Sequence, residues 1–138
     1  MFLKVRNQTR STVLGDKIQV AETMWARTKG LLGRASLGEG EGLLIAPCNA
    51  IHMFFMRFAI DVAFLDDADH VVRAVHAIRP WRATRFYPKA TAALELPAGT
   101  LARCLTQEGD ALLLEVFDGA TAPAGMEEGQ GAGSAPPP

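Results

Sequence analysis

The chain has little of what several classes of protein need. Its two cysteines, Cys48 and Cys104, are too few for a disulfide scaffold, so we expect free thiols, with a bridge between them as the alternative. Fourteen basic and fifteen acidic residues give a net charge of −1, without the basic excess of proteins that hold nucleic acid by its phosphates. The sequence also shows no phosphate-binding loop, serine-nucleophile motif or internal repeat.

Long apolar runs are lacking as well. Arg57 and Asp61 interrupt the apolar stretch 51–65, so no run approaches the ~20 residues that cross a bilayer. Charged residues also break up the first ten positions, which excludes the pattern of a secretory signal. We therefore expect a soluble, cytoplasmic protein that has neither a nucleic acid nor a membrane as its partner.

What is present fits one domain. An apolar fraction of 49% and a charged fraction of 21% in 138 residues allow a substantial core. Residues 1–118 are predicted to form a single β-rich domain, and the Gly/Ala/Pro-rich residues 119–138 a disordered tail. Many short strands without a βα alternation predict a mainly β fold, a compact β-barrel or sandwich with one or two short helices.

Turn residues and periodicity divide this domain into elements. The run 12–20 is predicted to fold back on itself as a hairpin at Gly15 and Asp16. Thr23 is a candidate N-cap for a helix. In chain order, the expected elements are strands 2–5 and 12–20, a helix over 22–32, strands 43–46 and 60–65, a hairpin partner over 71–78, a strand over 92–96, a helical turn within 100–106 and a closing strand over 111–117.

The segment 47–61 contains the most informative polar residues. Cys48, His52 and Met56 are spaced four apart, which places them on one face of either a helix or a strand. A thiolate, an imidazole and a thioether are soft ligands that suit copper. Because buried cysteine and methionine are commonly packing residues, we favour no metal, and His52 is either a site residue or a structural histidine.

Two carboxylates lie within apolar strands. Asp61 opens one such strand and Glu95 lies inside another. Since burying an unpaired carboxylate costs several kcal/mol, each needs an arginine, a histidine or a backbone N–H as partner. Arg34 and Arg57 are candidates, and for Asp61 a structural ion pair is an equal alternative to a functional role.

A loop over residues 79–89 interleaves cations with aromatic side chains. This pattern is used to stack nucleic-acid bases, but it also occurs in solvated loops that cover the edge of a core. The near-neutral charge of the chain favours the second interpretation.

Four blocks of the sequence, in this order, resemble the domain of unknown function 192, also called uncharacterised protein family 0127. The resemblance covers residues 20–116 and implies a compact β-barrel or sandwich with small helical insertions, and it brings no established activity. The chain has Phe where the family more often has Trp in the histidine block, and Leu32 where the family has Met. The matching blocks are Arg27–Arg34, Ile51–Arg57 (His-Met-Phe-Phe-Met-Arg after Ile51), Ile60–Asp66 and Leu94–Gly99, followed by Gly109-Asp110.

The leading functional hypothesis is a domain that binds a small polar or anionic molecule. Ionisable side chains would converge on the ligand between aromatic walls; they are His52, Arg34, Asp61, Glu95 and Arg57, with Phe54, Phe55 and Trp81 as walls. The alternatives are a copper or zinc site or a hydrolytic enzyme centred on His52 with Cys48 and Asp61, and an interaction module that uses residues 79–89. The sequence names no cofactor and no oligomeric state.

Overall fold

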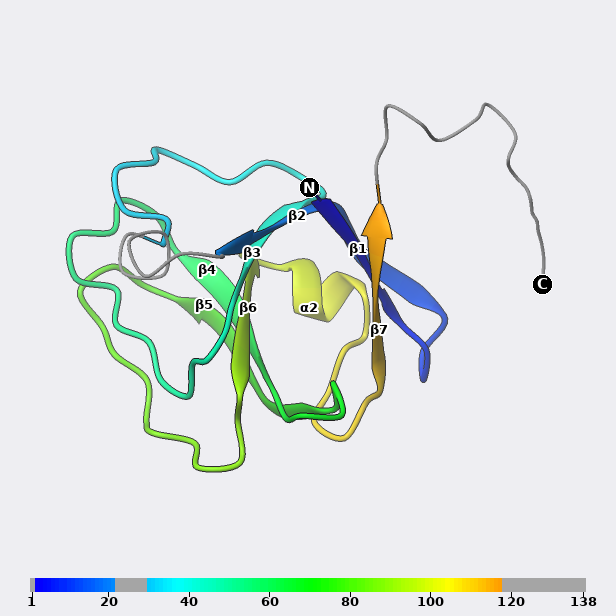
Figure 1. The fold of residues 1–138 in the computed structure, drawn as a ribbon. Helices are drawn as coiled ribbons and strands as arrows, with labels where there is room; N and C mark the ends of the chain where they lie inside the picture. The colour runs from blue at the N-terminus through cyan, green and yellow to red at the C-terminus, as the bar shows by residue number, and fades with distance from the viewer. Residues whose placement is uncertain (1, 22–29, 118–138) are drawn as a thin grey trace.

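The computed structural model describes residues 2–21 and 30–117, and Figure 1 shows a strongly curved sheet with one short helix. In chain order the elements are β1 (Phe2–Asn7), β2 (Thr12–Ala21), β3 (Glu41–Ile45), β4 (Ile60–Leu65), β5 (Val71–Ile78), β6 (Ala92–Pro97), α2 (Thr100–Arg103) and β7 (Leu112–Phe117). This architecture confirms the mainly β prediction. The expected tail and most of the expected helix over 22–32 lie outside the described residues.

The seven strands form one sheet in the order β5-β4-β6-β3-β2-β1-β7. Neighbouring strands are antiparallel except β2 and β3, which run parallel. The sheet curls into a half-barrel, and α2 packs against β4, β5 and β6. Within the described residues no helix is long and apolar enough to cross a membrane.

The two edge strands meet at one end of the curled sheet. His70 and Ala111 form an isolated antiparallel bridge between the segments that precede β5 and β7. The backbone N–H of Val71 donates to the carbonyl of Asp110 at 2.9 Å. The Asp110 carboxylate in turn accepts hydrogen bonds from Asn7 at 2.9 Å and Arg10 at 3.1 Å. The half-barrel is therefore joined at this end by both backbone and side-chain bonds.

The apolar residues form two cores, one on each face of the sheet. Ala63 and Leu65 of β4 belong to the first core together with Leu101 of α2. Val62 and Phe64 belong to the second core, which also contains Met53 and Met56 from the loop between β3 and β4. Because side chains alternate along a strand, β4 is buried on both faces, as the largely apolar run 60–65 predicts.

The hairpin predicted at Gly15 and Asp16 is wrong. The strand β2 continues through both residues, and the chain instead turns over residues 8–11 between β1 and β2. Gly15 serves close packing, because a Cβ there would lie 2.7 Å from the carbonyl oxygen of Gly40. The other predicted elements in the described residues are found within a few residues of their expected limits, including the hairpin of β4 and β5.

Candidate functional site

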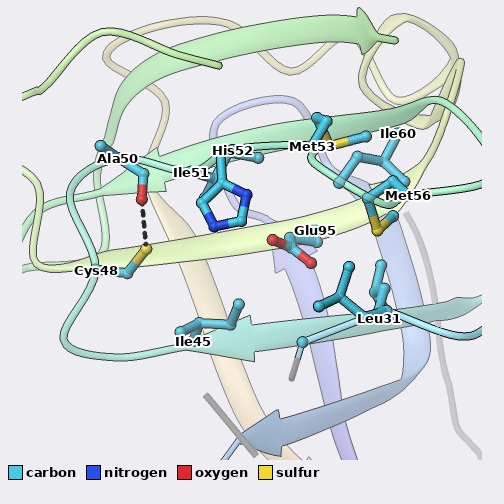
Figure 2. A pocket seen from close by; sticks show the side chains of 12 residues that line it. Leu31, Ile45, Cys48, Ala50, Ile51, His52, Met53, Met56, Ile60 and Glu95 are labelled. Atoms are coloured by element: carbon cyan, nitrogen blue, oxygen red, sulfur yellow. Dashed lines mark hydrogen bonds between the residues drawn. The ribbon is translucent and has the colours of Figure 1, made fainter. Parts of the chain in front are cut away.

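A cavity of about 130 Å³ lies in the second core, beneath the loop that joins β3 to β4 (Figure 2). Its polar lining consists of Glu95, His52 and Cys48. The other lining residues are Gly30, Leu31, Leu32, Ile45, Ala50, Ile51, Met53, Met56 and Ile60. Three chemically different polar groups therefore line one small, mainly apolar pocket, and of these Glu95 is buried, Cys48 half-buried and His52 exposed.

Glu95 lies at the centre of the sheet. It is on β6, opposite Leu43 of β3 on one side and Val62 of β4 on the other. Along β6 it shares a face with Ala93, which belongs to the second core, so its carboxyl points into that core. Only 6% of the residue is exposed, and burial raises the pKa of Glu95 to about 7.

The Glu95 carboxyl has no hydrogen-bond donor among residues 2–21 and 30–117. A buried carboxyl without a donor costs several kcal/mol, so native structures usually supply one, from the protein, from water or from a ligand. This is the feature of the site that packing does not explain.

His52 is held above Glu95 by pairing between two loops. It forms an isolated bridge with Ala83, and the neighbouring Met53 donates its N–H to the carbonyl of Arg82. The Nδ1 atom of His52 accepts the backbone N–H of Phe54 at 3.3 Å. Figure 2 shows the other ring nitrogen, Nε2, directed into the cavity between Cys48 and Glu95. With Nδ1 used as an acceptor, the neutral ring presents an Nε2–H donor to the cavity.

Cys48 contributes a protonated thiol. Its Sγ donates to the carbonyl of Ala50 at 3.3 Å. Burial raises the pKa of Cys48, and the nearby negative charge of Glu95 raises it further. Nucleophilic cysteines need a lowered pKa, so this environment works against the nucleophile or thiolate role considered from the sequence.

The soft-ligand set predicted from the four-residue spacing does share the cavity. Cys48, His52 and Met56 all line it, although Figure 2 shows Cys48 and Met56 on opposite sides of Glu95. In the part of the chain that the structure describes, no three residues among His, Cys, Asp and Glu are grouped as a metal site requires.

Asp61 is fully buried and does not reach the cavity. It lies on the same face of β4 as Ala63, so it points into the first core, away from Glu95. Its carboxylate accepts three backbone N–H groups, from Ala77 at 2.7 Å, Gly99 at 3.0 Å and Leu101 at 2.9 Å. The predicted backbone partner is thus present, and the residue ties β4 to β5 and to the start of α2.

The two arginines proposed for the site also lie outside the cavity. Arg34 is exposed and forms an ion pair with Glu41 at 3.0 Å, while Arg57 is exposed at the end of the histidine block. The backbone N–H of Gly38 donates to the same Glu41 carboxylate, and this bond lowers the pKa of Glu41 more than the Arg34 charge does. Arg34 thus closes a local loop, and the cavity-lining residues within 2–21 and 30–117 include no cation.

The three aromatic side chains expected as walls stand beside the cavity, on its outer side. Phe54 stacks on His52 with ring centroids 4.8 Å apart, and its other neighbour is Trp81 at 6.2 Å. Phe55 contacts Trp81 at 4.8 Å. All three are exposed, whereas the actual walls are aliphatic and thioether side chains that sequence reasoning treated as ordinary core. In the sequence the available signal was the three-residue spacing of Met53 and Met56, both of which the structure buries while it exposes Phe54 and Phe55 between them.

Comparisons with known proteins agree with this fold. A family described as an uncharacterized ACR, the domain of unknown function 192, matches residues 4–114. The UPF0127 protein of Thermococcus sibiricus is 35% identical over 118 residues, covering 80% of this chain and 73% of the relative. That of Thermococcus gammatolerans is 31% identical over 118 residues, covering 81% and 75%.

Two solved structures share the fold. A protein of unknown function from Novosphingobium aromaticivorans has a TM-score of 0.69 at 21% identity, over 80% of this chain and 82% of that one. A proposed transcription regulator from Sinorhizobium meliloti has a TM-score of 0.68 at 19% identity, over 81% and 91%. At these identities the likeness concerns the fold alone. Since the family match spans most of the sequence and agrees with the histidine block and the half-barrel, this chain is a member of the uncharacterised family of domain 192.

Proposed function

We propose that the chain is a binding domain for a small polar molecule that occupies the cavity between Glu95 and His52. The observation that carries the proposal is the Glu95 carboxyl, buried at the centre of the sheet without a hydrogen-bond donor in the described residues. A ligand that donates a hydrogen bond, or brings a positive charge, would remove the energetic cost of that burial.

The polarity of the cavity defines the ligand further. Glu95 in its charged form accepts hydrogen bonds, while the Nε2–H of His52 donates one. The ligand therefore carries a donor or cationic group for Glu95 and an acceptor for His52. Among the described residues that line the cavity none is a cation, which favours this type of molecule over an anionic one, the other possibility in the sequence-based expectation of a small polar or anionic ligand.

The size of the cavity limits the ligand as well. A volume of about 130 Å³ is below the ~300 Å³ at which pockets for drug-sized molecules begin, and close to that of a cavity that holds one benzene ring. The site therefore suits a molecule of a few heavy atoms, or one terminal group of a longer molecule, and not a whole nucleotide.

Titrations followed by two-dimensional NMR test the proposal with three probes. Ethanolamine supplies a cation and an acceptor, ethylamine lacks the acceptor, and acetate is an anion. We expect ethanolamine to shift the amides of Glu95 and His52 most and acetate least. Glu95→Gln should weaken ethanolamine binding about tenfold or more, while Glu115→Gln on exposed β7 should not. Preferential binding of acetate, or equal binding by both variants, would contradict the proposal.

A metal site is the second candidate, because Cys48, His52 and Met56 line the same cavity. Untagged protein would be loaded with copper(I), washed with chelator and analysed for metal. If the unaltered chain retains stoichiometric copper and the Cys48→Ser variant does not, the result supports this candidate. Copper that washes out of the unaltered chain eliminates it.

A further inference from the structure

Three aromatic side chains form an exposed ridge beside the cavity. The aromatic ridge consists of Phe54, Phe55 and Trp81, which are 43%, 70% and 59% exposed; Trp81 is in ring contact with both phenylalanines. They come from two loops, between β3 and β4 and between β5 and β6, which run side by side in Figure 1. Large aromatic side chains grouped at the surface mark a contact site more often than singly scattered ones do.

The backbone holds two of these residues in a strained conformation. Phe55 has a φ of 67° and Trp81 a φ of 71°, which is the left-handed region. Bulky residues are genuine outliers there, and each costs on the order of 1–3 kcal/mol. Two backbone hydrogen bonds from the partner loop fix this arrangement, from Trp81 to the carbonyl of Met53 and from Met53 to that of Arg82. The fold thus retains a costly conformation that keeps both rings in solvent.

The two chain segments that carry the ridge contain basic residues and no acidic ones. Residues 47–60 and 71–94 contain no Asp or Glu at all, although the whole chain has fifteen. The cations in these segments that are exposed and make no ion pair within the described residues are Arg57, Arg79, Arg82, Arg85 and Lys89. The arginines that do form ion pairs are Arg10, Arg34 and Arg73.

We propose that the aromatic ridge and its arginines dock this domain on an anionic lipid surface. Aromatic rings at turn tips enter the boundary between headgroups and acyl chains, and arginines around them bind lipid phosphates. Trp81 already contacts both phenylalanine rings, stacked on Phe54 and tilted against Phe55, which leaves less of its surface for a nucleic-acid base. They also project from turns, whereas a bound peptide usually lies in a groove.

This proposal departs from the sequence-based expectation of no membrane partner. That expectation came from the lack of an apolar run long enough to span a bilayer, which does not bear on attachment to its surface. The proposal is independent of what the cavity binds.

Co-sedimentation of the full chain with vesicles tests the proposal. We expect binding to vesicles of phosphatidylcholine mixed with phosphatidylglycerol, weaker binding to phosphatidylcholine alone, and a decrease with added salt. Phe55→Ala combined with Trp81→Ala should lower the affinity at least about tenfold. The matched control combines Leu105→Ala with Val116→Ala, which removes two equally exposed apolar side chains elsewhere. Trp81→Phe, which keeps an aromatic ring, should retain most of the binding.

The charges are tested separately. Arg82→Gln combined with Arg85→Gln should weaken binding to the mixed vesicles about tenfold or more, and Arg6→Gln combined with Arg103→Gln should not. An amide NMR spectrum of each variant establishes that it is folded. Failure of the unaltered chain to sediment with mixed vesicles would overturn the proposal, as would equal losses in ridge and control variants. Retention of the chain by single-stranded DNA or polyglutamate, without vesicle binding, would overturn it too.

Discussion

His52 accepts the backbone N–H of Phe54 on its Nδ1 atom, 3.3 Å away, and stacks against the Phe54 ring at the same time. One residue thus fixes both the direction of the imidazole and the nitrogen that faces the cavity. The first prediction follows from this pair. At a pH where the ring is neutral, His52 should carry its proton on Nε2, and long-range ¹⁵N–¹H NMR spectra of the three histidines would show it. A proton on Nδ1 would contradict this geometry.

The second prediction concerns pH and Glu95. The pKa of this residue is raised from 4.5 to about 7 by burial, so the folded state favours the protonated carboxyl. The contribution of Glu95 to the free energy of unfolding is complete below pH 4.5. It falls as the pH rises from 4.5 toward 7, by at most about 3 kcal/mol in total, and is lost above pH 7. Urea unfolding between pH 5 and 8 should therefore show a decline that Glu95→Gln flattens. The same decline in Glu95→Gln would mean that another group causes it.

The third prediction concerns the structural carboxylate. Asp61→Asn replaces one acceptor oxygen with an NH₂ group that faces backbone N–H donors. We expect a loss of roughly 3 kcal/mol in the free energy of unfolding, because these are hydrogen bonds to a buried charge. Asp67→Asn, in an exposed turn, is the control and should change it by less than about 0.5 kcal/mol. If Asp61→Asn and Asp67→Asn lower the free energy of unfolding equally, the three hydrogen bonds of Asp61 do not stabilise the fold.

The fourth prediction links backbone packing to the site. A Cβ at Gly42 would lie 2.6 Å from Ile18 and 2.7 Å from the carbonyl oxygen of Glu95. Gly42→Ala must therefore shift β6, and we expect a loss of about 2 kcal/mol together with amide shifts at Glu95. In Gly38→Ala the nearest atom belongs to the flexible Glu41 side chain at 3.3 Å, so its effect should be much smaller.

The fifth prediction concerns the strain at Phe55. Phe55→Gly and Phe55→Ala both remove the ring, but only glycine accepts a φ of 67° without cost. The glycine variant should be at least as stable as the alanine variant in urea unfolding. At Ala83, which is not among the positive-φ residues, replacement by glycine should instead cost about 0.5–1 kcal/mol. An alanine variant clearly more stable than the glycine variant would argue against strain.

The sequence predicted the strands well because most of them are apolar runs between clear turn residues. Both faces of β4 are covered, and five of its six residues are apolar, a pattern typical of a buried strand. Gly15 was misinterpreted because a glycine followed by an aspartate is also what a tight turn requires. Its true role depends on the approach of Gly40, which only the folded chain brings near.

The candidate site was predicted only in part. Both Asp61 and Glu95 were recognised as unusual, and yet they point to opposite faces of the sheet. Shifting the register of a strand by one residue reverses which of its side chains face a given core. Whether Asp61 and Glu95 share a face therefore depends on the strand register, which the composition of the strands does not determine. The location of the site was easier, because His52 and Cys48 lie in the most distinctive block and do line the cavity.

The closed end of the sheet also brings the first strand of the chain against the last, which affects how the chain folds during its synthesis. Asn7 bonds to Asp110, 103 positions later, and β1 pairs along its whole length with β7. A chain that emerges from the ribosome amino end first must leave one edge of β1 without a partner until every other described strand has been made. Such long-range pairing slows folding and exposes an unpaired edge to other chains. The cost of the closed end is therefore borne during translation, when chaperone protection of the first hairpin would matter most.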